Sequence, residues 1–591
     1  MRVGSRWNEE VHRCKIRFLA SYDGDIAPQA SRRARAHQLG RHPVAPLVVL
    51  GCAALATFVF LLSLQRGITF LVDEWILVDE RRSWSSDAFL HPFYEHLFIG
   101  PVLVFKVLMS TVGIGPHWAY AVPLLLLHIT CVTLVYVLAR RRIGAWFALA
   151  PALLILFLGA SYDNVLLPIQ VSFLGSMAAG LGVLVLFDSA PSRTRDVVAA
   201  CLLVGSLAWS SVGLIFLAAA LVEIVRAPRW RRRIWIVAAP SLLYAIWYVI
   251  YGSRGLQQGG SLQSNVPLVP QFVAESAAAA FGALSGLGLD WGRIFAALAL
   301  VAAVAAGLRR RTSPRTRVLA LIAALAVFWI LNGLARAHEG HATANRYIYP
   351  AAVLLVLLGV EALRQVELDR RWAVALSALV AVAAVGNADA LRDAKNIHLK
   401  FSREVRAQFA ALELLGRANV DPEFVAGTYL APTVTAAGYF DLADALGSPV
   451  DLRRDILAQG ETERTIADAT LARALARSPQ ADWSVDPSIP APGLDAVAYG
   501  SARRAGACLR FVPKGPGGSV SFVVRDGTVR VRAGSSPVTL SMRRFSEGGG
   551  AVSTIAPKST FGFTVPASDM AAEPWRFRAA SRESFTVCSV H

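Results

Sequence analysis

The sequence predicts a mainly α-helical polytopic membrane protein that ends in a small extracytoplasmic β-sandwich. Hydrophobic residues make up 55% of the 591 residues and charged residues only 17%, with a mean hydropathy of +0.47. A soluble chain of this length would carry about a quarter charged residues. The net charge of +18 is spread over short clusters between apolar runs. This pattern encodes membrane topology and argues against a nucleic-acid-binding face.

Residues 1–43 are polar and basic, and we interpret them as a disordered cytoplasmic tail. No signal-peptide pattern opens the chain, so the first apolar run should remain as a helix. Eleven runs have about the length that crosses a hydrocarbon core. They cover residues 44–66, 118–139, 143–160, 166–187, 197–211, 212–225, 232–251, 292–308, 318–334, 347–363 and 372–388.

The segment 97–112 is ambiguous because it is short and contains Pro101 and Lys106. If it lies in the membrane interface, the arginine clusters between later runs all face the side of the N-terminal tail. That side then holds 18 Lys and Arg in its short turns, against six in the opposite loops. The positive-inside bias therefore predicts an interfacial helix, an outer loop over 67–117 and an extracytoplasmic C-terminal part.

The C-terminal part divides by composition. Residues 389–495 show helical patterning, whereas 496–591 contain six or seven short β-prone runs separated by Gly and Pro. We expect an extracytoplasmic helical segment followed by a β-sandwich domain, with residues 44–388 forming the transmembrane domain. Cys508 and Cys588 lie near the two ends of the strand-rich part and would form a disulfide in an oxidising compartment.

The first outer loop is the densest group of ionisable residues in an apolar sequence. Asp73 and Glu74 follow the first span, and Glu95 and His96 precede the interfacial helix. Together with the segment 95–109 and the run from Arg346 to Pro350, this arrangement resembles the GT-C class of integral membrane glycosyltransferases, of an actinobacterial type. The resemblance covers about residues 44–390. It implies a GT-C-like fold and an enzyme that takes a hexosyl or pentosyl group from a polyprenyl-phosphate carrier.

The residue types suit that chemistry. Sugar transfer from a lipid phosphate to a hydroxyl requires a carboxylate that accepts the hydroxyl proton and cations that stabilise the departing phosphate. We expect Asp73 and Glu74 to be catalytic, with Asp73 as the base, and Arg346 to bind the phosphate because a guanidinium binds phosphate through two donors. The other predicted substrate-binding residues are Glu95, His96, Asp163, Asn164, Gln170, Arg254, Arg336 and Tyr347.

Cofactors are less clearly indicated. No glycine-rich nucleotide loop is present, which agrees with a lipid-linked donor. The run from His338 to His341 lacks the i, i+4 histidine spacing of helical zinc sites, so we predict no metal ligands, although the use of a divalent ion stays open. The predicted partners are a polyprenyl-phosphate-linked sugar, a glycan or lipid acceptor and the membrane.

Two other classes remain open. A lipid or polysaccharide transporter or flippase would place ionisable residues in the middle of its spans, which are nearly free of charge here. A non-catalytic envelope assembly protein would tolerate replacement of Asp73 by Asn. The sequence therefore favours a multi-pass glycosyltransferase of the cell membrane, with a cytoplasmic N-terminus and an extracytoplasmic C-terminal domain. Its acceptor would lie in the cell envelope.

Overall fold

The computed structural model describes residues 44–258, 262–309, 315–427, 429–477, 485, 488–515, 517–567 and 573–590. The chain divides into two compact units, residues 1–53 and 54–591. The described part of the first unit is the start of helix α3, Ala45–Leu64. All features discussed below belong to the second unit.

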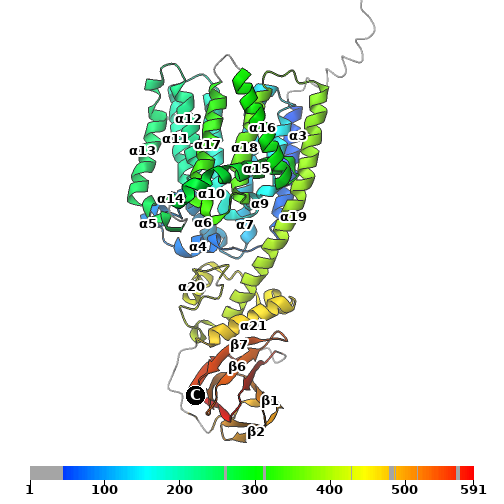
Figure 1. Ribbon diagram of the computed structural model, residues 1–591. Helices are drawn as coiled ribbons and strands as arrows, with labels where there is room; N and C mark the ends of the chain where they lie inside the picture. Colours follow the sequence, from blue (N-terminus) through cyan, green and yellow to red (C-terminus); the bar gives the residue numbers. More distant parts are fainter. Residues whose placement is uncertain are drawn as a thin grey trace, which may run out of the picture. The chain divides into compact units, whose positions relative to one another are not determined.

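The second unit is mainly helical as far as Leu475 (Figure 1). Its longer helices are α6 (Ile99–Val112), α7 (His117–Ile143), α8 (Leu149–Leu156), α10 (Val171–Phe187), α11 (Arg193–Trp209), α12 (Gly213–Val225), α13 (Trp235–Ile250), α15 (Val269–Ser285), α16 (Leu289–Arg309), α17 (Thr316–Arg336), α18 (Asn345–Leu363) and α19 (Arg370–Leu415). The shorter α-helices are α4 (Asp73–Glu80), α5 (Ser86–Leu90), α9 (Tyr162–Leu166) and α14 (Leu262–Asn265).

The predicted fold class is confirmed, because helices occur in all eleven predicted spanning segments. Among the described residues, eight helices are long and apolar enough to cross a membrane, or nine if α8 and the bent segment Gly159–Leu166 form one span. The chain is thus a multi-pass membrane protein. Helices α12 and α13, with 13 and 16 residues, are shorter than a full span, so the number of spans stays a prediction.

None of the eleven predicted spans covers residues 252–291, whereas the segment Gln263–Ser285, which includes α15, is one of the eight apolar helices. Just before α15, Asn265 donates a hydrogen bond to the carbonyl of Leu334, near the predicted outer end of α17. Within α15, the Ser276 hydroxyl donates to the carbonyl of Ala342 in the loop after α17. These contacts with the predicted outer side favour a helix that packs among the outer helix ends over an additional span.

Helix α19 continues for 46 residues from its apolar first part into a polar second part. At about 1.5 Å per residue it is about 69 Å long, roughly twice the thickness of a hydrocarbon core. Figure 1 shows it running from the helical bundle to α21 (Glu461–Leu475), against which it packs. Helix α20 (Ala436–Leu446) lies between them in sequence.

Helix α21 anchors the strand-rich part through one buried carboxylate. Asp468 accepts hydrogen bonds from the backbone N–H groups of Arg544, Phe545 and Ser546 and from the Ser546 hydroxyl. These hydrogen bonds therefore fix the turn after β6 to helix α21. Burial raises the pKa of Asp468, although these hydrogen bonds oppose the effect.

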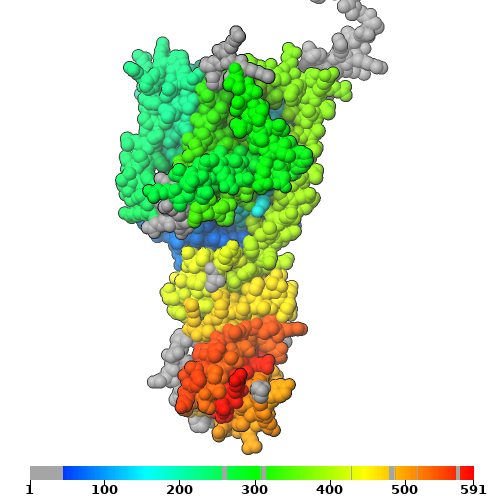
Figure 2. Space-filling model, in the orientation of Figure 1, coloured from blue at the N-terminus to red at the C-terminus, as the bar shows by residue number. Residues whose placement is uncertain are grey.

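The strand-rich part is a sandwich of two five-stranded antiparallel sheets, drawn in orange and red in Figure 2. One sheet has the order β1-β4-β9-β6-β7, and the other has the order β2-β3-β10-β5-β8. The strands are β1 (Gly493–Ala498), β2 (Gly500–Ala505), β3 (Cys508–Pro513), β4 (Ser519–Val524), β5 (Gly527–Arg532), β6 (Val538–Arg543), β7 (Gly550–Ile555), β8 (Thr560–Val565), β9 (Trp575–Ala580) and β10 (Phe585–Val590).

Ten strands exceed the six or seven expected from the sequence. The three additional strands are β1, β2 and β7, and each is an edge strand. Because edge strands need bury only part of their surface, they lack the apolar runs that identify the central strands. A disulfide joins Cys508 in β3 to Cys588 in the neighbouring strand β10.

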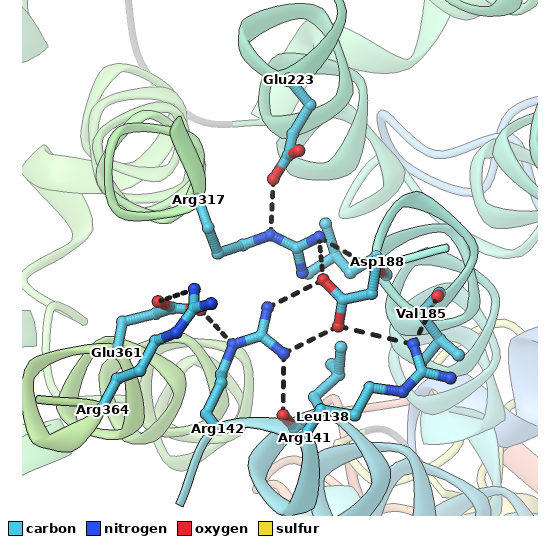
Figure 3. Close-up of polar contacts among 10 residues, drawn as sticks. Leu138, Arg141, Arg142, Val185, Asp188, Glu223, Arg317, Glu361 and Arg364 are labelled. Atoms are coloured by element: carbon cyan, nitrogen blue, oxygen red, sulfur yellow. Dashed lines mark hydrogen bonds and ion pairs between the residues drawn. The ribbon is translucent and has the colours of Figure 1, made fainter. Parts of the chain in front are cut away.

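A buried ionic cluster joins the helix ends that the charge count assigns to the inner side (Figure 3). Arg142 at the end of α7 donates to both oxygens of Asp188, at 2.7 and 2.8 Å, and to Glu361. Arg317 at the start of α17 donates to Asp188 at 2.9 Å and to Glu223 at 2.5 Å. The ends of α7, α10, α12, α17 and α18 are therefore linked by ion pairs.

Candidate active site

Helix α4 begins with Asp73, and the backbone before it is strained. Val72 has a φ of 40°, a value that β-branched residues rarely adopt. Its N–H donates a 2.8 Å hydrogen bond to the carbonyl of Leu430. Such strain persists only where the surrounding structure holds it, and it is common at functional sites. The strained turn determines where Asp73 starts the helix.

Tyr94 holds the Asp73 carboxylate in place. Its hydroxyl donates a 2.9 Å hydrogen bond to Oδ1 of Asp73. Tyr94 also has a positive φ, 52°. Burial raises the pKa of Tyr94, and the charge of Asp73 raises it further, so the hydroxyl keeps its proton and remains a donor. Val72 and Tyr94, which both have a positive φ, therefore both position Asp73. Val72 does so as its neighbour in the chain, and Tyr94 does so through its side-chain hydrogen bond.

Glu74, the residue after Asp73, is almost fully buried. Its Oε2 accepts from the N–H of Leu71 at 3.2 Å and lies 3.4 Å from Nε2 of His117. Its Oε1 accepts from the N–H of Ile169 at 3.1 Å. The carboxylate thus joins the start of α4 to α7 and to the turn before α10. This geometry is that of a positioning residue.

Glu95, His96 and Arg336 form a second polar group. One guanidinium nitrogen of Arg336 lies 2.9 Å from both carboxylate oxygens of Glu95. Burial alone would raise the pKa of Glu95, but His96 and Arg336 outweigh it and hold that pKa below its usual value. Nδ1 of His96 lies 2.5 Å from the Ser211 hydroxyl, and burial lowers the pKa of His96.

Arg346 differs from Arg336 in its partners. Arg336 is paired with Glu95 and lies 3.6 Å from Glu339. Arg346 lies over the ring of Tyr347 at 5.2 Å. It forms no ion pair within 4.0 Å with a residue that the structure describes, although the Asp163 carboxylate interacts with it electrostatically. Its charge is still felt at Tyr94 and His96, so it lies within electrostatic range of the groups around Asp73.

Most of the polar side chains described above, though not Glu74, line one cavity of about 720 Å³. Of the residues predicted from sequence, it brings together Asp73, Glu95, His96, Gln170, Arg336, Arg346 and Tyr347. They come from the first outer loop, the turn before α10 and the outer ends of α17 and α18. Phenylalanine and aliphatic side chains form much of the remaining wall. A cavity with this lining has polar groups at specific points on an apolar surface, as ligand sites commonly do.

Four predicted residues lie outside the cavity lining. Glu74 is buried as described above. Asp163 lies 3.8 Å from Nε2 of His398, and Asn164 donates to the side chain of Gln170 at 3.2 Å. Arg254 is exposed on a short 3₁₀ segment. The glycine after Arg254 allows this segment to approach the carbonyl of Tyr94, because a Cβ atom there would lie 1.6 Å from that oxygen.

The sequence interpretation missed several polar residues of the cavity, which are Tyr94, Ser172, Ser211, Tyr244, Tyr248, Asn332 and Glu339. Tyr94 directly precedes Glu95, so its position in the outer loop was a signal. The Tyr244 and Tyr248 pair is spaced by one helical turn, which places both on one face of α13. Ser211 sits in the short break between α11 and α12, where only the fold brings it to His96.

Among the described residues, no group of three His, Cys, Asp or Glu side chains is arranged to hold a metal ion. The cavity does combine a carboxylate, a guanidinium without an ion-pair partner and an apolar wall. This set can accept a proton from a hydroxyl and bind an anionic group of a partly apolar ligand.

No protein-family model and no curated protein matches the chain. Solved structures that are similar to it include the following two. ArnT from Cupriavidus metallidurans, solved bound to undecaprenyl phosphate, is 17% identical over 77% of this chain and 83% of its own, with a TM-score of 0.40. The arabinofuranosyltransferase AftD from Mycobacteria is 11% identical over 92% of this chain, with a TM-score of 0.37. The chain spans 61% of the AftD chain.

Proposed function

We propose that the protein is a membrane glycosyltransferase that moves a sugar from a polyprenyl-phosphate carrier to a hydroxyl group of a cell-envelope acceptor. The observation that carries the proposal is the shared cavity of Asp73 and Arg346. These residues are 273 positions apart in sequence, and one follows the first span while the other opens a late one. Because both residues line the same cavity, we infer that they act on the same substrate.

In this proposal Asp73 is the general base. Tyr94 occupies its Oδ1, which leaves Oδ2 for the acceptor hydroxyl. As the acceptor oxygen attacks the anomeric carbon of the sugar, its proton passes to Asp73. The bond between that carbon and the phosphate oxygen breaks, and the carrier leaves as polyprenyl phosphate. A positioned base of this kind contributes about 10²- to 10⁴-fold to the rate.

Arg346 binds the phosphate of the carrier. An arginine already neutralised by carboxylates, as Arg336 is by Glu95 and Glu339, has less charge to offer an anion. Among the described residues Arg346 forms no ion pair within 4.0 Å, and Asp163 acts on it only from a greater distance. The phosphate gains charge as the sugar leaves. The guanidinium therefore stabilises the transition state more than the bound donor, which is the condition for catalysis.

The remaining residues have supporting roles. Glu74 and Tyr94 position Asp73, whereas Gln170 and Tyr347 contact the sugar or the acceptor. Glu95, paired with Arg336, forms the opposite side of the site. The N-terminal tail is cytoplasmic and the cavity opens on the outer side, which is supported by the charge bias between loops and by the Cys508–Cys588 disulfide.

The test is donor cleavage by purified protein in lipid vesicles. A panel of polyprenyl-phosphate hexoses and pentoses is supplied with a cell-envelope extract as the acceptor, and release of polyprenyl phosphate is followed. Asp73→Asn should lower turnover by about 10²- to 10⁴-fold and leave the melting temperature unchanged.

Asp87→Asn is the matched control, since Asp87 is an exposed carboxylate of the same loop and does not line the cavity. It should retain the wild-type rate. The proposal fails if the wild-type protein cleaves none of the donors, or if Asp73→Asn turns over as fast as Asp87→Asn.

A further inference from the structure

The sheet β2-β3-β10-β5-β8 has an outward face rich in arginine. In β3, the side chains of Leu509 and Phe511 are buried, whereas Arg510 is exposed. Because side chains alternate across a strand, Arg510 points away from the interior of the sandwich. Its cross-strand partners share this orientation, so the register identifies the residues of the outward face.

The register aligns three arginines in one row across the sheet. Arg503 in β2 is opposite Arg510, Arg510 is opposite Thr586, and Thr586 is opposite Arg532. We call Arg503, Arg510 and Arg532 the arginine row. Neighbouring strands are about 4.8 Å apart, so the row places positive charges about 5 Å and about 10 Å apart.

The arginine row has no acidic counterpart. All three side chains are exposed, and none forms an ion pair with another residue in the part of the chain that the structure describes. The five strands of this sheet contain five arginines and no Asp or Glu. Residues 493–590 contain 13 Lys and Arg against six Asp and Glu, a formal excess of seven positive charges.

Directly opposed like charges destabilise a sheet. Arg503 and Arg510 form such a pair, so the row is unfavourable for folding alone and becomes favourable when an anion neutralises it. Guanidinium groups bind carboxylates and phosphates through paired donors. The spacing of the row matches a ligand with several anionic groups better than a single small anion.

We propose that the arginine row binds an anionic glycan of the cell envelope, one that carries carboxylate or phosphate groups. The inference depends on the proposed outer location of residues 389–591 and not on the transfer reaction. A polymer that binds here would be held to the enzyme at a second point, away from the cavity.

A glycan fits this face better than the lipid surface does. Helix α21 packs against β6 and β7, which belong to the other sheet. The arginine row therefore lies on the sheet opposite to the one against which α21 mainly packs. Charge attraction is screened within about 8 Å at physiological salt, so lipid headgroups beyond that distance would exert little force.

The test uses the full-length protein in nanodiscs of zwitterionic lipid. Binding to polygalacturonate and to a phosphomannan is measured, with neutral dextran as the reference polymer. The wild-type protein should bind at least one anionic polymer and not dextran, and the binding should weaken as salt is added. The triple variant Arg503→Gln, Arg510→Gln, Arg532→Gln should bind at least about tenfold more weakly, equivalent to about 1.4 kcal/mol.

The matched control removes three other exposed arginines, Arg525→Gln, Arg543→Gln and Arg582→Gln, which lie outside the row and change the net charge equally. This variant should bind like the wild-type protein. The proposal is overturned if both variants weaken binding equally, if no anionic polymer binds, or if the row is needed for binding anionic lipid vesicles but not for either polymer. Donor cleavage is measured on the same samples, so failure of the transferase proposal is seen separately.

Discussion

The two ends of the helical bundle use the same kinds of charged side chain in opposite ways. In the inner ionic cluster, Arg142 and Arg317 each contact two carboxylates, and Asp188 is shared by both (Figure 3). In the outer cavity, Asp73 is bound by a tyrosine and Arg346 by a tyrosine ring. The inner charges neutralise one another, whereas Asp73 and Arg346 face a shared space without forming an ion pair.

The difference shows how a charge near lipid can be assigned a role. A buried charge must be compensated, because leaving it unpaired costs several kcal/mol. Where the opposite charge comes from the protein itself, removing one residue of the ion pair lowers the stability of the fold. Where the protein supplies too little opposite charge and a cavity is present, a bound ligand can supply it. The following substitutions test this distinction, from the largest expected effect to the smallest.

Replacing Arg317 by Met should destabilise the protein by about 3–5 kcal/mol, because Asp188 and Glu223 would lose a buried cation. Turnover per folded molecule should stay unchanged. Thermal unfolding in detergent measures the first effect, and donor cleavage measures the second. The control is Arg364→Met, whose side chain is 52% exposed and 4.0 Å from Glu361, with an expected cost of at most about 1 kcal/mol. Equal melting temperatures for both variants would contradict a structural role for the cluster.

Replacing Arg346 by Gln should have the reverse profile. The loss of a charge-assisted contact is worth about 1.5–3 kcal/mol, so kcat/KM for the donor should fall about 10- to 150-fold with little change in stability. Arg336→Gln is the comparison, since it should lower stability by leaving Glu95 without its cation. A larger fall in kcat/KM for the donor in Arg336→Gln than in Arg346→Gln would assign phosphate binding to Arg336 and contradict our assignment of it to Arg346.

Replacing Tyr94 by Phe removes one hydrogen bond to Asp73 and retains the ring. The expected loss is about 0.5–1.5 kcal/mol, or about 2- to 13-fold in kcat, because the carboxylate is less well oriented. KM for the donor should change little. Tyr499→Phe, on the exposed surface of the sandwich, is the control and should match the wild-type rate. An unchanged kcat in Tyr94→Phe would show that Tyr94 does not position Asp73 for catalysis.

Acid should affect the cavity through Glu95, and the effect should be the smallest. The pKa of Glu95 is lower in the folded protein than its ordinary value. Its pairing therefore stabilises the fold above the ordinary pKa of about 4.3, and this contribution is lost as the pH falls through the lower folded value. Between pH 7 and pH 8, above the ordinary pKa of the neighbouring His96, the wild-type protein and Glu95→Gln should differ by a constant amount in unfolding free energy. Below about pH 4 the difference should shrink, as melting curves at each pH would reveal.

Much of the fold could be predicted because its signals are local. Apolar runs of membrane length mark the helices. The arginine clusters between these runs predict on which side of the membrane each loop lies. The charge count groups Asp73, Glu95, Arg336 and Arg346 on one side, and these residues line one cavity. Edge strands gave weaker signals, since β2 reads as a polar segment with Arg503 and Arg504.

Side-chain direction was harder to predict. Asp73 and Glu74 are neighbours in the first turn of α4, where successive residues point about 100° apart, and only Asp73 lines the cavity. Arg81 belongs to the charged run from Asp79 to Arg82, a composition typical of an exposed helix turn, yet it is only 6% exposed and donates to the carbonyl of Pro92 at 3.0 Å. Its partner is a backbone atom, which sequence patterns do not identify.

The long helix α19 constrains the site through the rotational position of its residues about the helix axis. Its buried residues Asn387, Leu391, Ala394, His398, Ser402 and Val405 recur at intervals of three and four positions, as along a coiled-coil seam. Through this seam the Ser402 hydroxyl accepts a hydrogen bond from the N–H of Thr69, four residues before Asp73. One residue inserted in the helix would rotate everything beyond it by about 100°. The geometry around Asp73 thus depends on the exact number of residues in a helix that does not itself line the cavity.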